Sequence, residues 1–210
     1  MQPSRPAAAS RRTSRLPRGA RRLQLLRAAQ DVFVAHGFHA AAMDDIADRA
    51  GVSKPVLYQH FPGKRELYLA LMEEHVSGLA DRVAEAMATT EDNRARVDAA
   101  VGAYFDFVDA DGEAFRLVFE SDLRNDDDVR AIVDRGTAVC VQAIADVIAA
   151  DTGADPERAL LIASGLTGSA EHSARWWLPR KGSISRDEAV ALMSSLAWRG
   201  ISGFPLVDGE

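Results

Sequence analysis

The chain has 210 residues and a formal net charge of −6 at pH 7, with 47% apolar residues, which favours one or two small domains over a large multidomain enzyme. No apolar run approaches the roughly 20 residues of a membrane span, and no apolar stretch follows the arginine-rich start, so we expect a cytoplasmic protein without membrane contact. The single cysteine, Cys140, excludes an internal disulfide and leaves too little sulfur for a zinc site.

Positive and negative charge are unevenly distributed along the chain. Residues 1–65 hold 12 Lys and Arg against 4 Asp and Glu, whereas the remaining residues hold 13 against 27. A basic segment on an acidic protein is expected if only that segment approaches a polyanion such as nucleic acid. For residues 1–22, a solvated basic tail explains the charge equally well.

Helical periodicity begins after an arginine- and proline-rich start. Residues 1–17 have no apolar period, and we expect them to form a disordered basic arm. Glycines and a candidate cap at Ser53 then punctuate the chain, which predicts three helices over 19–36, 44–50 and 54–60. An apolar residue at every fourth position predicts one long connecting helix over 64–88.

The rest of the chain also shows helical spacing and no strand-like alternation. A compact aromatic run lies at 113–120, and helices are predicted over 94–110, from the acidic residues 126–128 to Gly153, from Asp155 to about Trp177, and from a capping box at Ser185 and Glu188 to about Gly200. We therefore expect an all-α fold of about nine helices. Its domains are a helix-turn-helix unit over 18–65 and a helical body for ligand binding and dimerisation over 66–210.

The helix-turn-helix is predicted from the two short helices, because this motif places its second helix in the major groove of DNA. Four apolar residues are expected to pack the two helices together: Ile46, Ala47, Val52 and Leu57. The outward side chains suit DNA, since lysine binds phosphates, glutamine reads base edges and apolar groups contact thymine methyls. The predicted DNA-binding residues are Ser53, Lys54, Pro55, Val56, Tyr58, Gln59, His60, Lys64, Arg18 and Arg21.

A more specific pattern lies in the same segment: Ile46-Ala47, Ala50-Gly51-Val52-Ser53, Leu57-Tyr58, His60-Phe61, Lys64 and Leu67, after Phe33 and Gly37. With it, residues 20–72 resemble the TetR family of bacterial transcriptional regulators. The resemblance implies that Ser53, Lys54 and Tyr58 lie at the DNA, with His60 and Lys64 mostly on phosphates.

Two features of the chain depart from the family pattern. Family members usually have Thr or Ser where this chain has Ala42 and Met43, so one helix cap and one phosphate contact are in doubt. Seven arginines between residues 5 and 22 form an arm that we hypothesise enters a minor groove.

The resemblance also implies a homodimer on a palindromic operator, formed by the last two long helices. The candidate interface residues, which also suit the protomer's own core, are Ala163, Thr167, Ala170, Glu171, Ala174, Met193 and Leu196. The resemblance further implies a pocket for a small hydrophobic inducer inside the body. Its candidate residues, which suit a plain core as well, are Tyr104, Phe105, Phe107, Phe115, Phe119, His172 and Trp176.

These inferences predict a dimeric repressor that a small apolar ligand releases from its operator through the connecting helix. The alternative is a DNA-binding regulator without a small-molecule inducer, controlled by a protein partner or by its own abundance. Neither a phosphate-binding loop, a nucleophile elbow nor a zinc-protease motif is present, so no enzyme and no cofactor is expected. Glu120, Asp122 and His172 are too scattered to predict a metal site, and Cys140 is expected to be a buried, inert thiol.

Overall fold

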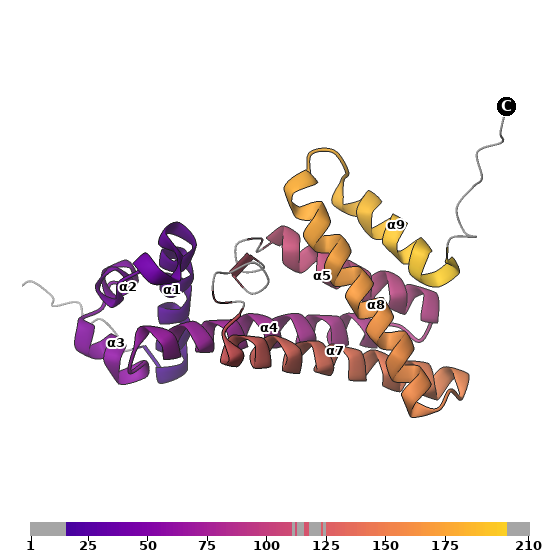
Figure 1. Ribbon diagram of the computed structural model, residues 1–210, viewed down its shortest axis with the longest axis horizontal. Coiled ribbons are helices and arrows are strands. Elements are labelled where there is room, and N and C mark those ends of the chain that lie inside the picture. The colour runs from indigo at the N-terminus through magenta and orange to yellow at the C-terminus, as the bar shows by residue number, and fades with distance from the viewer. Residues whose placement is uncertain (1–15, 111, 113–115, 118–122, 124, 201–210) are drawn as a thin grey trace, which may run out of the picture.

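The computed structural model describes residues 16–110, 112, 116, 117, 123 and 125–200 (Figure 1). Within these residues the chain forms eight α-helices, one short 3-10 helix and no strand, so the expected all-α fold is confirmed. Residues 1–15 of the predicted arm and most of the aromatic run at 113–120 lie outside the described part. None of the described helices combines the length and the apolar content needed to cross a membrane.

Three helices form the amino-terminal unit: α1 (Arg18–Ala40), α2 (Met43–Ala50) and α3 (Lys54–His60). Each buries one face in a shared core, where Leu25, Ile46 and Leu57 are fully buried. Gly37 has a φ of 73°, a conformation that side chains disfavour, and it breaks the regular part of α1 where the sequence predicts a helix end. Because α2 contacts α3 and Ile46, Ala47 and Leu57 are buried there, the expected packing of the two helices is confirmed.

The long helix α4 (Lys64–Ala88) has the bounds that the sequence predicts. Its 25 residues span about 37 Å at 1.5 Å per residue. Its first turns pack on α1, where Tyr68 lies edge-on to Phe33 with ring centroids 5.2 Å apart. Its later turns enter the body and bury Leu79 and Val83 there, so one helix belongs to both halves of the molecule (Figure 1).

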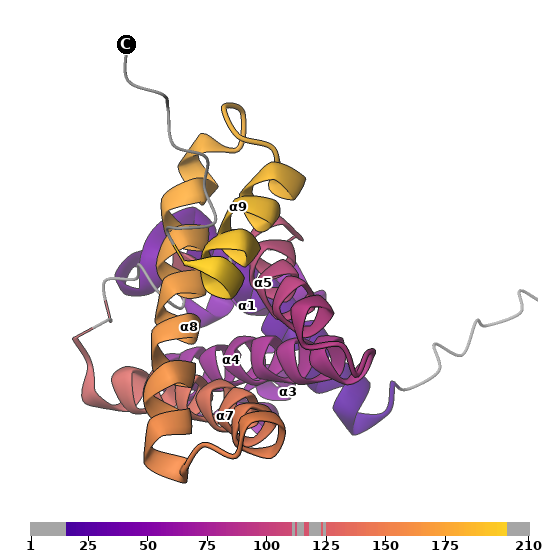
Figure 2. The same ribbon diagram turned by 90° about the vertical axis from the view of Figure 1, so that its right-hand side faces the viewer.

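The body consists of α5 (Asn93–Ala110), α7 (Asp127–Thr152), α8 (Pro156–Trp177), the 3-10 helix η1 (Leu178–Arg180) and α9 (Arg186–Arg199). Helix α7 runs beside α4, α8 crosses over α7 and α5, and α9 packs on α5 (Figure 2). The side chains of Asp126, Asp155 and Ser185 accept backbone N–H groups at the starts of α7, α8 and α9.

Gly51 makes the turn of the helix-turn-helix and carries a prediction about stability. Its φ is 64°, its N–H donates to the carbonyl of Asp48, and the N–H of Val52 donates to that of Ala47, which together end α2 as a Schellman motif. A side chain at Gly51 meets no atom within 4 Å, so its cost is purely conformational.

We expect Gly51→Ala to lower the free energy of unfolding by roughly 1–2 kcal/mol, the cost of a left-handed non-glycine residue. Denaturant titration measures this change. Gly78→Ala is the control, because Gly78 lies within α4 with open space around it, and alanine there is expected to stabilise the helix by up to about 1 kcal/mol. Equal effects of both substitutions would contradict the account of the turn.

Candidate nucleic-acid interface and ligand cavity

Helix α3 keeps one side against the core and presents the other to solvent. Leu57 is fully buried, whereas the next residue, Tyr58, keeps 49% of its surface exposed. The other side chains predicted to meet DNA from this helix are also accessible: Ser53, Lys54, Pro55 and Gln59 are exposed, and Val56 and His60 are half-buried. The outer face of α3 is therefore available to a groove of DNA.

The start of α3 differs from the expected cap. Ser53 stands at the cap position with extended backbone angles, but its hydroxyl makes no cap hydrogen bond. Its carbonyl accepts the N–H groups of Val56 and Leu57 instead, at 2.9 and 3.3 Å. The prediction of a side-chain cap is wrong, because a proline at the second helical position and backbone contacts begin this helix. The hydroxyl of Ser53 is left for another partner.

Lys54 lies on the exposed side of α3 and is paired with an acidic residue of α2. Its Nζ is 2.6 Å from Oδ2 of Asp44, and this hydrogen bond raises the pKa of the lysine. Both side chains are more than half exposed, and such pairs contribute little to stability. A DNA phosphate can therefore replace Asp44 at small cost, and the predicted contact of Lys54 with DNA stays a prediction.

Lys64 opens α4 and is directed toward the amino-terminal unit. Its Nζ donates to the carbonyl oxygens of His39 and Ala41 at 3.0 and 2.9 Å, and it lies 4.8 Å from the centre of the Phe38 ring. These contacts hold the loop between α1 and α2 against α4. The predicted contact of Lys64 with a phosphate stays a prediction. In the structure the ammonium group also binds the two carbonyl groups at the end of α1.

An arginine-lined groove lies between the start of α1 and the end of α3. It has a volume of about 380 Å³ and is lined by Leu16, Arg18, Arg21, Val56, Gln59 and His60. Burial lowers the pKa of His60 below its usual 6.5, and the positive charges of Arg18, Arg22 and Arg21 lower it further. His60 is therefore neutral at pH 7 in the protein alone, and the groove's charge comes from arginine.

A large apolar cavity lies in the body between α5, α7, α8 and α9. Its volume is about 390 Å³, within the range of ligand pockets, and most of its wall is apolar, including Val101, Ile144, Val147, Leu166 and Met193. The Arg96–Asp151 ion pair, with its atoms 2.8 Å apart, adds charge to the lining. Thr167 also lines the cavity, and its buried hydroxyl has no hydrogen-bond partner in the described structure.

The residues predicted to line a pocket are only partly brought to this cavity. Tyr104 lines it, whereas Phe105 packs on Trp177 with ring centroids 5.4 Å apart. Phe107 lines a void of about 10 Å³ beside the cavity. His172 and Trp176 are exposed on the outer side of α8, so predicting them as pocket residues was wrong. Phe115 and Phe119 lie outside the described residues.

The chain matches two family models over most of its described length. The model of bacterial regulatory proteins of the tetR family matches residues 25–71, and the model of the tetracyclin repressor-like C-terminal domain matches residues 93–200. The chain is also 50% identical to the HTH-type transcriptional activator FasR of Mycolicibacterium smegmatis, over 96% of this chain and 92% of that protein. The chain belongs to the TetR family. It is a DNA-binding regulator of transcription.

Solved structures agree with this membership. A TetR-like transcriptional regulator from Rhodococcus sp. RHA1 is 32% identical, with a TM-score of 0.65 over 90% of this chain and 100% of that one. FadR from Bacillus subtilis, solved in complex with stearoyl-CoA, has a TM-score of 0.66 over 85% of this chain and 98% of that one. At 18% identity, FadR shows the shared fold alone.

Four of the seven predicted dimer residues of this TetR-family chain face the protomer's own core. Ala163, Thr167, Ala170 and Ala174 are buried, and Glu171 is half-buried, where burial raises the pKa of its carboxyl group beside Arg175. The four buried residues are small and let α8 lie close to α7 and α5, so their prediction as interface residues was wrong. A role of Glu171, Met193 and Leu196 in a dimer stays a prediction. Met193 lines the cavity and Leu196 is half-buried on α9.

The opposite face of α8 carries an exposed stripe that the sequence analysis did not assign to an interface. Leu161, Gly165, Gly168, His172 and Trp176 are all exposed and recur three or four positions apart, and Leu161 keeps 75% of its surface exposed. Added side chains at Gly165 and Gly168 meet nothing within 4 Å. This spacing is visible in the sequence, but it competes there with the equally regular buried stripe.

Cys140 is the remaining side chain of the described body that could be reactive. Cys140 is buried, as expected, and shares a hydrogen bond with the Tyr104 hydroxyl, while burial raises the pKa of its thiol. Among the described residues, no three His, Cys, Asp or Glu side chains gather closely enough to hold a metal ion. The described body therefore offers one large apolar cavity and a buried Tyr104–Cys140 contact.

The lowered pKa of His60 predicts how DNA affinity depends on pH. Phosphates beside Arg18 and Arg21 raise the pKa of His60, so the complex binds more protons than the separate protein. Operator affinity is therefore expected to rise as the pH falls from 7.5 to 5.5, by roughly two- to tenfold, because one proton changes affinity by at most tenfold per pH unit. Fluorescence anisotropy at constant ionic strength measures this.

His60→Gln is expected to remove this dependence while keeping a hydrogen-bonding side chain. The stability of the folded protein has the opposite pH dependence. His60 binds a proton more tightly in the unfolded chain, so its protonation favours unfolding as the pH falls below 6.5. A circular dichroism spectrum at each pH therefore accompanies the titration. The same rise in affinity for His60→Gln would show that His60 does not approach a phosphate.

Proposed function

We propose that this TetR-family regulator binds a palindromic operator as a homodimer and changes its operator affinity when an acyl ligand enters the body cavity. The exposed outer face of α3, built around Tyr58, is the single observation that carries the DNA-binding part. In this division of work, residues 18–65 read DNA, residues 66–210 bind ligand and partner, and the helix 64–88 connects them. Its place of action is the bacterial cytoplasm, where the genome lies.

The outer face of α8 supports the dimer. One helix-turn-helix reads only a few base pairs, so regulators of this type pair to cover two half-sites. Leu161 and Trp176 provide apolar area at the two ends of this face, and Gly165 and Gly168 between them allow a second helix to approach closely. Leu192 and Trp198 of α9 are also more than 40% exposed and extend the apolar surface.

The composition of the cavity supports a ligand with an acyl chain. Its walls are mostly aliphatic, which favours a hydrocarbon chain, and the Arg96–Asp151 ion pair gives the lining one polar region. A fatty acyl thioester has both an apolar chain and a polar head. The structural neighbour FadR of Bacillus subtilis holds stearoyl-CoA, which is such a molecule.

The direction of regulation that we propose is activation, whereas the sequence predicts repression. The relative that matches nearly the whole chain at 50% identity is named an activator. We therefore propose that this regulator raises transcription from its operator.

The DNA-binding part is tested with Tyr58→Ala on DNA fragments that the unaltered protein selects from the source genome. We expect specific binding to fall by at least about tenfold, since contacts to base edges are worth roughly 1–3 kcal/mol each. Sedimentation is expected to show an unchanged dimer. In a reporter strain, the unaltered protein is expected to raise transcription and Tyr58→Ala to leave it at the basal level.

Loss of the dimer in Tyr58→Ala would show that this side chain supports the fold and does not read DNA. Unchanged specific binding would remove α3 as the reading helix. Lower transcription with the unaltered protein would restore repression as the outcome of binding.

The ligand part is tested with stearoyl-CoA and thermal unfolding. At a concentration of 100 times Kd, a ligand stabilises the folded state by about 2.7 kcal/mol, which raises the Tm by roughly 5–10 °C for a chain of this size. Ala100→Phe places an aromatic ring in the cavity, where it obstructs an acyl chain, and is expected to remove the shift. Ala138→Phe, the same change at an exposed position of α7, is expected to keep it.

A Tm that stearoyl-CoA leaves unchanged would favour the alternative of control by a protein partner or by abundance. An equal shift in Ala100→Phe would place the ligand outside this cavity.

A further inference from the structure

Helices α4 and α7 run side by side in the same direction over much of their length (Figure 1). Arg65, the second residue of α4, contacts Asp126 and Asp128 at the start of α7. Farther along, Glu73 lies 3.9 Å from Arg135, and Val76 meets Gly136. The two helices therefore keep nearly the same register from their first residues onward.

The contact at Gly136 is the closest approach recorded at any glycine of the described chain. A Cβ atom added to Gly136 would lie only 1.8 Å from Cγ1 of Val76, which no real structure tolerates without a shift. Helix α7 is therefore pinned against α4 at this point. The void of about 10 Å³ beside the contact, lined by His75 and Val133 among others, leaves the neighbouring side chains some room.

Two important points of α7 lie at nearly equal distances from Gly136. One is Val147 in the cavity wall, 11 residues or about 16 Å away, and the other is Asp126, 10 residues or about 15 Å away. A rigid helix held between two such points moves them in opposite directions by similar amounts. Pushing the cavity end outward by about 1 Å would therefore displace Asp126 by about the same distance.

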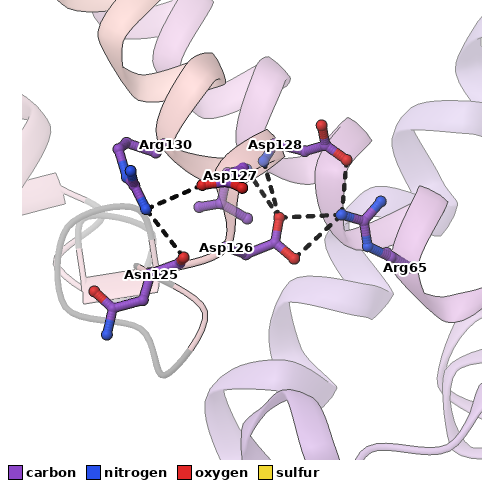
Figure 3. A network of polar contacts seen from close by, with 7 residues as sticks. Arg65, Asn125, Asp126, Asp127, Asp128 and Arg130 are labelled. Carbon is purple, nitrogen blue, oxygen red and sulfur yellow. Dashed lines mark hydrogen bonds and ion pairs between the residues drawn. The ribbon is translucent and has the colours of Figure 1, made fainter.

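Arg65 is the residue that meets the moving end (Figure 3). Its Nη2 lies 3.1 Å from both carboxylate oxygens of Asp126 and 2.7 Å from Oδ2 of Asp128. Asp126 is itself tied to α7, because its Oδ1 accepts the N–H groups of Asp128 and Val129. A displacement of about 1 Å exceeds what such hydrogen bonds can stretch, so it must either break them or pull Arg65 along.

Lys64, the residue before Arg65, connects α4 to the amino-terminal unit. Lys64 holds the carbonyl groups of His39 and Ala41, which belong to the amino-terminal unit. Movement of the first turn of α4 is therefore passed to the loop before α2, and so to the position of α3.

We infer that α7 is a lever that rocks about Gly136 when the cavity is filled, and that Arg65 is the coupling residue through which the lever moves the DNA-reading unit. The inference rests on the proposed function in one respect, that the cavity is the ligand site. It adds the element that moves, the pivot and the contact that transmits the motion.

The test measures how much filling the cavity changes operator affinity, with and without the Arg65 contact. The cavity is filled in two ways, by stearoyl-CoA and by Val147→Phe, which pushes on α7 from within. Each is expected to change the operator Kd in the same direction by about tenfold in the otherwise unaltered full-length protein, a usual size for coupling between sites.

Two variants break the contact. Arg65→Gln removes the positive charge on α4. Asp126→Asn removes the negative charge at the start of α7 and keeps a residue that caps helices well. In either background, filling the cavity is expected to change the operator Kd by less than about twofold. Because Arg65→Gln also removes a positive charge near DNA, each change is taken relative to its own background.

Two controls match these variants. Asp155 caps α8 and pairs with Arg158, so Asp155→Asn repeats the chemistry of Asp126→Asn at a helix start that does not meet α4. Arg130 contacts Asn125 and Asp127 at the start of α7, so Arg130→Gln removes a charge beside the contact without touching Arg65. Both are expected to retain the full tenfold change.

The outcomes separate the lever from the proposed ligand. A full change in Arg65→Gln or Asp126→Asn would overturn the lever, and so would an unchanged Kd in folded Val147→Phe. If Val147→Phe does not fold, Ile144→Phe, one turn earlier in the same wall, takes its place. Val147→Phe could change the operator Kd while stearoyl-CoA does not, and Arg65→Gln could cancel that change. This result would support the lever and reject stearoyl-CoA as the ligand.

Discussion

Two neighbouring cations at the start of α4 contact the two halves of this protein on opposite sides. Lys64 binds backbone carbonyls of the amino-terminal unit, and Arg65 binds carboxylates at the start of α7. Neighbouring residues on a helix point about 100° apart, so a single turn can face both halves. Tyr68 repeats the arrangement one turn later, with its ring against Phe33 and its hydroxyl donating to the carbonyl of Leu117.

This constraint makes the position of α3 depend on the body. A flexible linker would let the reading helices find their grooves whatever the body does. Here α4 shares its buried residues with both halves, and one continuous core runs from Leu25 to Ala189. A change inside the body can therefore reach α3 through packed side chains and ion pairs.

Charge and exposure together characterise the candidate nucleic-acid interface. The amino-terminal part is basic, but several of its cations are paired within the protein: Arg49 with Asp31, and Lys54 with Asp44. These pairs are exposed. Arg18 and Arg21 line the groove beside His60, whose pKa is lowered by burial and by the charges of these arginines. The number of basic residues predicts a polyanionic partner. The ion pairs within the protein determine which basic side chains can contact that partner without first losing an acidic neighbour.

The all-α fold, the bounds of α3 and α4, the turn at Gly51 and the family can all be predicted from the order of the amino acids. These features depend on signals within a few residues, such as Pro55 at a helix start or an apolar residue every fourth position. The folded chain is needed to know which stripe of α8 is buried, which groups Lys64 binds, where the cavity lies and that Arg65 contacts Asp126, 61 positions away. Both stripes of α8 have helical spacing, and an arginine can pair with any carboxylate. Only the packing of distant helices selects among them, because burial and distance belong to the assembled chain.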